Sequence, residues 1–238
     1  MTTSFQPSEY QQALFDWALH GTGNAIVDAV PGSGKTTSIV QLIKQLIAQN
    51  PDVTILNVAF NNHIVDTLKE KIGDAPNVEI KTVHSLGRMG LAMVLGFLQR
   101  PDNRKYQMLA EQVLARKYKR LANSKDGKKE LRELKRSLAN LVNMMQLTLN
   151  DNAREVAINY GIQFEPKYAS DVFPMAQEVI QRGKDAAGFS KQINFTDMLY
   201  LPVAMNVTMP KYDWVLVDEA QDLSAAAREL ILRCAHEG

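Results

Sequence analysis

The chain has 238 residues, 45% of them hydrophobic and 22% charged, and its formal net charge at pH 7 is +1. This is the composition of an ordinary soluble protein, and the length is enough for one α/β domain with an insertion or for two small domains. The single cysteine, Cys234, excludes an internal disulfide and a thiolate zinc cluster, and it is typical of a reducing compartment.

The first part of the chain alternates strand-like and helical patterns. Helical periodicity is found at Glu9–His20, Thr36–Gln49 and Asn62–Ile72. Short apolar runs predict strands at Asn24–Val30, Val53–Phe60 and Val78–Val83. Ser8 is the expected N-cap of the first helix. Because strands and helices alternate, we expect βαβ units and a parallel sheet.

The most apolar stretch, Leu86–Leu98, follows the third of these strands. Arg88 and three glycines interrupt it, so it falls short of the ~18 apolar residues of a membrane span. The N-terminus has neither the basic start nor the apolar middle of a signal peptide. We therefore expect a cytoplasmic protein with no membrane partner.

The stretch from Gln99 to Gly188 differs in character from the part before it. It holds no convincing strand, and its long helical patterns lie at Tyr106–Leu121, Lys128–Leu149 and Ser170–Ala187. Between Arg100 and Arg136 there are 13 Lys and Arg against 5 Asp and Glu, a net charge of +8 that leaves −7 for the rest of the chain. We interpret the stretch as a helical insertion. Its basic run is either an electrostatic footprint for nucleic acid or a solvated helical face.

The nine residues Ala29–Thr37 lie between the first apolar run and a helical pattern, which is the setting of a phosphate-binding loop. Gly32 and Gly34 allow successive N–H groups to face phosphate oxygens at the positive end of the following helix. Lys35 would reach the β and γ phosphates, and the hydroxyl of Thr36 would bind Mg²⁺. The residues of this loop that we expect to bind ATP are Pro31, Gly32, Ser33, Gly34, Lys35, Thr36 and Thr37.

Strand character returns at Trp214–Val217, and a last helix is expected at Ala225–His236. The strand ends in two adjacent carboxylates, Asp218 and Glu219. Asp218 would hold Mg²⁺ through its water shell, and Glu219 would orient and deprotonate the water that attacks the γ-phosphate. Lys35 lies 183 residues before Asp218, so only folding can join the two halves of this site.

Together these motifs resemble those of the UvrD/Rep-type superfamily 1 DNA helicases, and they occur in that family's order. Pro7–Gln11 is similar to the Q motif, Ile55–Asn62 to motif Ia, and Thr82–Ser85 to the T-x-H-S motif. Asp218–Gln221 matches motif II, and Asn194–Leu199 resembles the segment that precedes it. The resemblance covers nearly the whole chain.

The resemblance implies a role for individual residues. Gln11 would read the adenine. Four residues would act in catalysis around the triphosphate, namely Lys35, Asp218, Glu219 and Gln221. Residues after the second and third predicted strands would contact single-stranded DNA, namely Phe60, Asn61, Asn62, His63, Thr82, His84 and Ser85. Phe60 and His84 could instead be core residues, and Gln11 could decorate an exposed helix.

The fold that the resemblance implies is a RecA-like P-loop NTPase, in which a parallel sheet is flanked by helices and carries an inserted all-helical subdomain. The ATP-binding domain would comprise residues 1–98 and 189–238, and the helical insertion residues 99–188. The implied activity is ATP hydrolysis, with Mg²⁺, coupled to 3′ to 5′ translocation on single-stranded DNA and to separation of strands at duplex junctions. Such helicases act in DNA repair or replication.

The sequence departs from the family pattern in three places. His63 stands where the family often has a lysine, and Thr37 where many members have an arginine beside the adenine. The chain stops at Gly238, before the strand that the family inserts between the phosphate-loop strand and the Asp-Glu strand. We therefore expect a truncated N-terminal fragment with an incomplete sheet, complemented by a C-terminal helicase domain or by another chain. Alone it would bind nucleotide, hydrolyse little and unwind nothing.

Two other functions stay open. A non-catalytic nucleic-acid-binding or regulatory module could keep the same fold. An RNA helicase is also compatible with the motifs, because stacking and phosphate contacts do not by themselves select the sugar.

Overall fold

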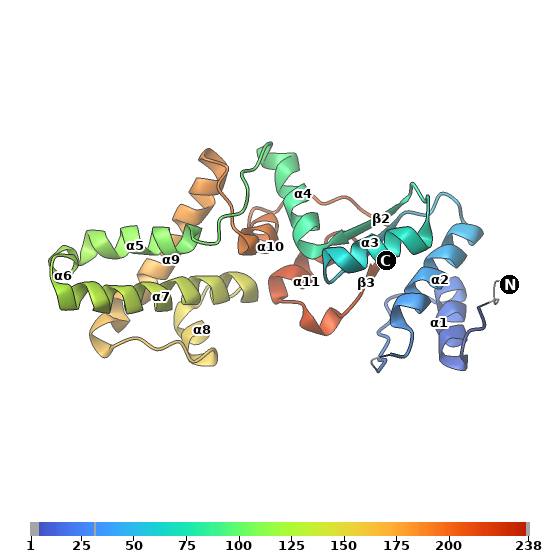
Figure 1. Ribbon diagram of the computed structural model, residues 1–238, viewed down its shortest axis with the longest axis horizontal. Coiled ribbons are helices and arrows are strands. Elements are labelled where there is room, and N and C mark those ends of the chain that lie inside the picture. The colour runs from blue at the N-terminus through green and yellow to red at the C-terminus, as the bar shows by residue number, and fades with distance from the viewer. Residues whose placement is uncertain (1–4, 31, 237–238) are drawn as a thin grey trace. The chain divides into compact units, whose positions relative to one another are not determined.

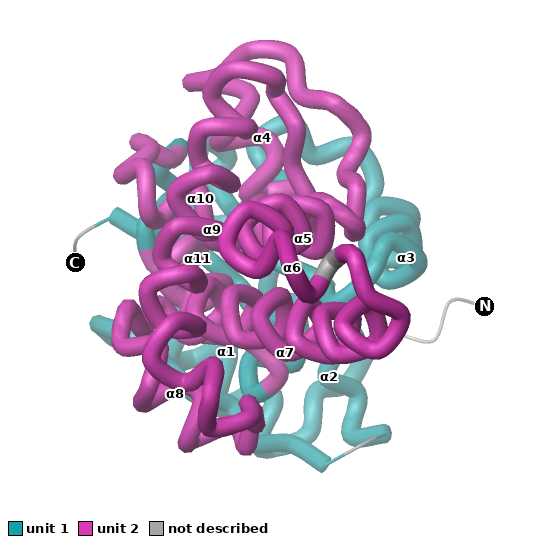
Figure 2. The backbone as a smooth tube through the Cα atoms, turned by 90° about the vertical axis from the view of Figure 1, so that its left-hand side faces the viewer, with its two compact units in different colours: residues 1–83, 210–221, 233–238 teal, residues 84–209, 222–232 magenta. Residues whose placement is uncertain are grey.

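The computed structural model describes residues 5–30 and 32–236 of the chain. These residues form two compact units (Figure 1). Unit 1 comprises residues 1–83, 210–221 and 233–238, and unit 2 comprises residues 84–209 and 222–232 (Figure 2). Each unit is therefore built from segments that are far apart in the sequence.

Unit 1 contains a three-stranded parallel sheet in the order β2-β1-β3. The strands are β1 (Ile55–Ala59), β2 (Val78–Thr82) and β3 (Trp214–Val217). The central strand β1 is buried along its whole length, which is typical of a parallel strand covered on both faces. Because all three strands run the same way, their carboxyl ends meet at one edge of the sheet, where Ala59 lies opposite Thr82.

Three helices cover one face of this sheet, as Figure 1 shows. They are α1 (Glu9–His20), α2 (Lys35–Gln49) and α3 (Asn62–Ile72). Apolar residues of α1 and α2 pack against Ile55 and Trp214, and those of α2 and α3 pack against Ile80. Ser8 caps α1, as predicted, and Asn61 caps α3 through a hydrogen bond from the N–H of Ile64.

The first predicted strand, Asn24–Val30, is wrong, because these residues form no strand in the structure. The side chain of Ile26 is 99% exposed, and Val27 and Val30 are exposed as well. An apolar run becomes a strand only when a neighbouring strand accepts its hydrogen bonds, and no strand of the described residues pairs with this one. The expectation of an α/β fold whose parallel sheet is incomplete is confirmed.

Unit 2 is helical. Its elements are α4 (Val83–Leu95), α5 (Lys105–Lys117), α6 (Lys119–Ala122), α7 (Lys125–Thr148), α8 (Ala153–Asn159), the 3₁₀ helix η1 (Pro166–Tyr168), α9 (Ala169–Phe189), α10 (Phe195–Ala204) and α11 (Ala225–Leu232). A further 3₁₀ helix, η2 (Ala220–Asp222), follows β3. One apolar cluster from α5, α7, α8, α9 and α10 forms the core of the unit.

The structure corrects several predicted helix boundaries. The helix predicted at Tyr106–Leu121 is broken at Tyr118, whose φ and ψ of −106° and 44° are not helical. The last helix ends at Leu232 rather than His236, because Tyr212 forms a parallel bridge with Ala235. Helices α4, α8 and α10 were not predicted, since α8 is short and the other two are largely apolar without a clear polar face.

No helix of the described residues combines the length and the apolar character that crossing a bilayer requires.

Candidate functional site

The loop before α2 contains two glycines with a left-handed backbone. Gly32 and Gly34 have φ angles of 80° and 87°, a left-handed conformation that side chains other than hydrogen disfavour. Gly34 is also the N-cap of α2, so the loop leads directly into the positive end of a 15-residue helix. Ser33 and Thr37 are exposed and Thr36 is half-buried, while Pro31 lies outside the described residues.

The structure brings this loop to the acidic end of β3. The ammonium of Lys35, the first residue of α2, donates a hydrogen bond of 2.7 Å to Oε1 of Glu219. The side-chain amide of Gln221 donates to the other oxygen of the same carboxylate, at 2.5 Å. The hydrogen bond from Lys35 is the main cause that lowers the pKa of Glu219, with a smaller contribution from Gln221. Glu219 is therefore an anion held between two donors.

Asp218 is the last residue that the sheet orients directly, since its N–H donates to the carbonyl of Val58 on β1. Burial raises the pKa of its carboxyl group, the neighbouring Glu219 raises it further, and Lys35 opposes both. The next residue, Glu219, has a φ of 52°, which is unusual for any residue except glycine. Because of this turn the two adjacent carboxylates point in different directions. That of Asp218 lies at the strand end, and that of Glu219 points toward Lys35.

The carboxylate of Asp218 and the hydroxyl of Thr36 are the hard oxygen ligands that Mg²⁺ prefers. Both come from segments that already meet through the Lys35–Glu219 ion pair. The donor set therefore fits a magnesium ion bound together with a triphosphate. Lys35 and Glu219 are each about one-third exposed, so a ligand can reach them from solvent.

Gln11 lies beside the same loop. It is the third residue of α1, where its side-chain oxygen accepts from the N–H of Ser8 in a capping box. Its amide nitrogen donates to Oγ of Ser38 on α2, at 2.9 Å, and Ser38 in turn donates to the carbonyl of Gly34. The structure thus ties Gln11 to the phosphate loop, and the capping box gives its amide a fixed orientation.

The predicted nucleic-acid contacts of unit 1 lie at the carboxyl edge of the sheet. Phe60 directly follows β1, and its side chain is 63% exposed, so it is not a core aromatic. Asn61, Asn62 and His63 follow it at the exposed start of α3. Thr82 ends the neighbouring strand β2 and is buried. Its side chain is therefore less accessible to a ligand than the prediction requires.

The remaining predicted contacts, His84 and Ser85, begin α4 in unit 2. Ser85 is exposed, and His84 is half-buried, which lowers the pKa of its imidazole. The ring of His84 meets that of Phe195 edge to face, with 5.7 Å between the centroids. Phe195 is 48% exposed at the start of α10. Phe195 is not among the predicted contacts, although it lies within the segment Asn194–Leu199 that resembles a family motif.

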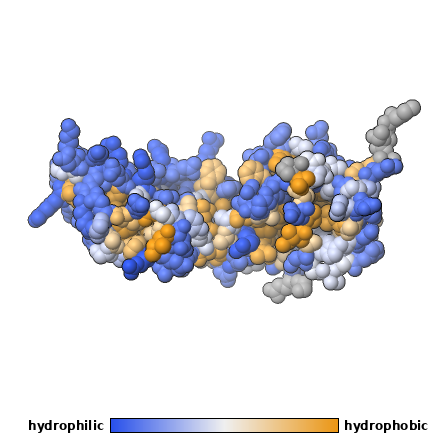
Figure 3. All heavy atoms as spheres, turned by 90° about the horizontal axis from the view of Figure 1, so that it is seen from below, coloured by the Kyte–Doolittle hydropathy of each residue, from blue (hydrophilic) through white to orange (hydrophobic). Residues whose placement is uncertain are grey.

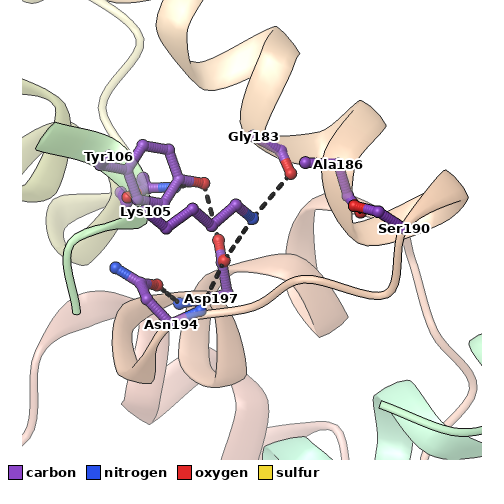
Figure 4. A network of polar contacts seen from close by, with 8 residues as sticks. Lys105, Tyr106, Gly183, Ala186, Ser190, Asn194 and Asp197 are labelled. Atoms are coloured by element: carbon purple, nitrogen blue, oxygen red, sulfur yellow. Dashed lines mark hydrogen bonds and ion pairs between the residues drawn. The ribbon is translucent and has the colours of Figure 1, made fainter. Parts of the chain in front are cut away.

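A buried polar network fixes the first turn of α10 (Figure 4). The ammonium of Lys105 donates to Oδ2 of Asp197 at 2.6 Å and to the carbonyl of Gly183 on α9 at 2.8 Å. The hydroxyl of Tyr106 donates to Oδ1 of the same carboxylate, at 2.6 Å. The N–H of Asn194 donates to Oδ2, and the N–H of Asp197 donates to the side chain of Asn194, so α10 is capped as well.

Burial lowers the pKa of Lys105 and raises that of Tyr106, while the carboxylate of Asp197 raises both. Lys105 and Asp197 have no exposed side-chain area. The network therefore joins α5, α9 and α10 through charged groups that solvent does not reach. It holds Phe195, two residues before Asp197, in place beside His84.

Comparison with known proteins identifies the family. No curated protein matches the chain. The sequence model of the UvrD/REP helicase N-terminal domain matches residues 11–238. This range begins at Gln11 and includes the phosphate loop, the two carboxylates that follow β3 and the whole of unit 2. The chain belongs to the UvrD/REP helicase N-terminal domain family, and it is thus the motor domain of a helicase.

Proposed function

We propose that the chain binds ATP with Mg²⁺ at the loop of residues 29–37 and, as part of a helicase, couples its hydrolysis to movement along single-stranded DNA. The observation that carries this proposal is the ion pair between Lys35 and Glu219, which joins the phosphate loop to the acidic strand end at 2.7 Å. A glycine turn that only caps a helix would have no reason to meet a carboxylate 184 residues away.

The ion pair suggests the order of events at the site. The triphosphate competes with Glu219 for the ammonium of Lys35, because both are anions. Once Lys35 turns to the phosphates, Glu219 loses its strongest donor and its carboxylate becomes available to accept a proton from water. Binding of the nucleotide would therefore release the general base that hydrolysis needs.

Mg²⁺, when bound, neutralises charge on the phosphates and links their oxygens to the protein. Thr36 and Asp218 are the residues that would hold it. Gln221 donates to Glu219 and would keep its carboxylate oriented after Lys35 has left. Gln11 would contact the adenine, through the second hydrogen of the amide that already donates to Ser38.

For the nucleic acid we propose two stacking sites, one in each unit. Phe60 offers an exposed ring at the carboxyl edge of the sheet, with the polar start of α3 beside it. Phe195 and His84 offer a pair of rings whose relative orientation is fixed. Rings of this kind stack on nucleobases regardless of sequence, which suits a motor that moves along a strand.

The direction of movement, 3′ to 5′, is part of the same proposal and rests on the resemblance alone. The division into an ATP-binding domain with a helical insertion at residues 99–188 is also proposed, and it rests on the resemblance together with the change in composition at that stretch. We further expect the 238-residue chain by itself to bind nucleotide, to hydrolyse it slowly and not to unwind DNA. Hydrolysis is expected to be slow because phosphoryl transfer gains factors of ~10³–10⁵ in rate from cationic groups supplied in addition to the loop lysine.

Two variants test the proposal in opposite directions. Lys35→Ala should weaken binding of a fluorescent ATP analogue by more than about tenfold, since it removes a charge-assisted hydrogen bond to phosphate. Glu219→Gln should keep or raise that affinity, because the carboxylate of Glu219 no longer competes with the phosphates for Lys35, but it should abolish residual hydrolysis. Lys44→Ala, an exposed lysine further along α2, is the matched control.

Equal nucleotide affinity of Lys35→Ala and Lys44→Ala would reject the proposed nucleotide site and favour a non-catalytic module. The same oligonucleotide sequence as DNA and as RNA should then be compared in the binding assay, because a site that contacts the 2′-hydroxyl distinguishes the two. If the chain binds the RNA more tightly than the DNA, the proposed substrate becomes RNA.

A further inference from the structure

One face of α7 carries a continuous polar stripe. Its members, spaced as i, i+4, i+7, i+11, i+15 and i+18, are Lys125, Lys129, Arg132, Arg136, Asn140 and Asn143. This spacing averages 3.6 residues, so the six side chains lie in one row along the helix. The buried residues Leu134, Leu138 and Leu141 lie on the other side, and the row therefore faces away from the core.

The cations of the basic run fall into a paired and an unpaired group. Five other cations of the basic run each meet a carboxylate, in the pairs Arg104–Asp102, Lys105–Asp197, Arg116–Glu178, Lys117–Asp171 and Lys135–Glu111. Within residues 5–30 and 32–236, by contrast, the four cations of the stripe form no ion pair, and all four are exposed. The stripe thus holds four of the eight cations of the basic run that form no ion pair among the described residues, and the exposed Glu133 lies beside it, four residues after Lys129. The other four are Arg100, Lys119, Arg120 and Lys128.

The space-filling view shows the hydropathy of this region (Figure 3). The end of unit 2 that carries α6 and the start of α7, at the left of Figure 3, is covered mainly by hydrophilic side chains. A solvated helical face would have this appearance too, so the charge alone does not identify a ligand.

A groove at the other end of the stripe gives the second observation. It has a volume of about 440 Å³ and is lined by polar side chains from three helices, among them Arg136, Asn140 and Asn143 of α7, Asn103 and Gln107 near the start of α5, and Asn194 before α10. Amide groups both donate and accept hydrogen bonds, and together with one arginine they suit the alternation of sugar and phosphate. Tyr106, Ser137 and Ala139 complete the lining, so the groove is polar only in part.

The groove leads to the aromatic pair. Asn143, the last member of the stripe, accepts a hydrogen bond of 2.7 Å from the hydroxyl of Thr196. Asn194, the N-cap of α10, lines the groove. Phe195 lies between Asn194 and Thr196 in the sequence. All of these residues belong to unit 2. The stripe, the groove and the Phe195–His84 pair are therefore contiguous.

We propose that this face of α7 binds the sugar-phosphate backbone of the single strand whose bases stack on Phe195 and His84. The proposal rests on the proposed function. From Lys125 to Asn143 the stripe is about 27 Å long, which at the B-form spacing would accommodate about eight phosphates of one strand. Four of them would meet a cation, and the amides of the groove would contact the backbone nearest the stacked bases.

The test is the salt dependence of oligonucleotide binding. The variant Lys125→Gln/Lys129→Gln/Arg132→Gln/Arg136→Gln removes the four charges and keeps residues that favour helices. A labelled oligo(dT) is titrated by fluorescence anisotropy at several NaCl concentrations. Each phosphate contact to a single strand contributes about −0.7 to the slope of log K against log[salt], so the variant's slope should be smaller by about 2.8.

The matched control is Lys44→Gln/Lys69→Gln/Lys71→Gln/Arg154→Gln, which removes four exposed cations elsewhere in the chain. Its slope should stay within about 0.7 of wild type. Circular dichroism of both variants shows whether they are folded. Equal slopes for the two quadruple variants would overturn the proposal. The proposal would also be overturned if the stripe variant changed the salt slope for a duplex probe but not for oligo(dT). That result would assign the stripe to double-stranded DNA.

Failure of the stripe and failure of the proposed function give different results. If Phe195→Ala weakens oligo(dT) binding while the stripe variant keeps the wild-type slope, only the stripe proposal is rejected. If the wild-type chain does not bind oligo(dT) at all, both proposals are rejected.

Discussion

The chain contains two lysine–carboxylate pairs of nearly equal length in very different surroundings. Lys35 and Glu219 of unit 1 are 2.7 Å apart with both side chains about one-third exposed, whereas Lys105 and Asp197 of unit 2 are 2.6 Å apart with neither exposed. The first pair can exchange its partner for a ligand. The second has three further hydrogen bonds to protein groups and no access to solvent. Burial, rather than distance, therefore separates an ion pair that a ligand can reach from one that solvent cannot.

The largest effect should follow from breaking the buried pair. Lys105→Met leaves the carboxylate of Asp197 charged and buried, which should lower the free energy of unfolding by about 3–5 kcal/mol. Urea denaturation followed by circular dichroism measures it. The double variant Lys105→Met/Asp197→Leu should recover part of the loss, since no charge remains buried. A single variant within about 1 kcal/mol of wild type would contradict the structural role assigned to the pair.

A smaller effect is expected where the buried network positions an exposed ring. Phe195→Ala should weaken oligo(dT) binding by about 1–3 kcal/mol, the value of one base stacked on an aromatic side chain. Phe189→Ala removes an exposed ring elsewhere in unit 2 and serves as the control. Fluorescence anisotropy at fixed salt compares them, and equal affinities would remove Phe195 from the stacking site.

The smallest effect concerns the exposed pair and pH. The hydrogen bond from Lys35 lowers the pKa of Glu219, so the unfolded chain binds this proton more readily than the folded one. The pair's contribution to stability is therefore present above the pKa of an unfolded glutamate and is lost as the pH falls through the lowered value. Between about pH 6 and about pH 3, wild type should lose slightly more thermal stability than Glu219→Gln. If the melting temperatures of wild type and Glu219→Gln fall equally over this pH range, the prediction is contradicted.

Sequence patterns predicted the parts of the fold that local chemistry determines. The bounds of α1 and α3 were correct because caps and apolar periodicity mark them, and β3 was correct because its apolar run stops at Asp218. The run at Asn24–Val30 has the same local character, but whether it becomes a strand depends on a neighbour that the run itself does not specify.

The candidate site divides in the same way. Glycines at left-handed positions and a lysine at a helix start are visible in the sequence, so the phosphate loop could be located before the structure was known. Phe195 could not be assigned, because its exposure and its contact with His84 depend on a buried network whose members are up to 92 residues apart.

The left-handed backbone at Glu219 has a consequence for protein engineering. A side chain at this φ is disfavoured, and glycine would adopt it without strain. A selection for thermostable variants would therefore be drawn to Glu219→Gly, a substitution that also deletes the carboxylate. A stabilised variant obtained in this way should be checked for ATP turnover before it is used, because the proposed function assigns the general base to this carboxylate.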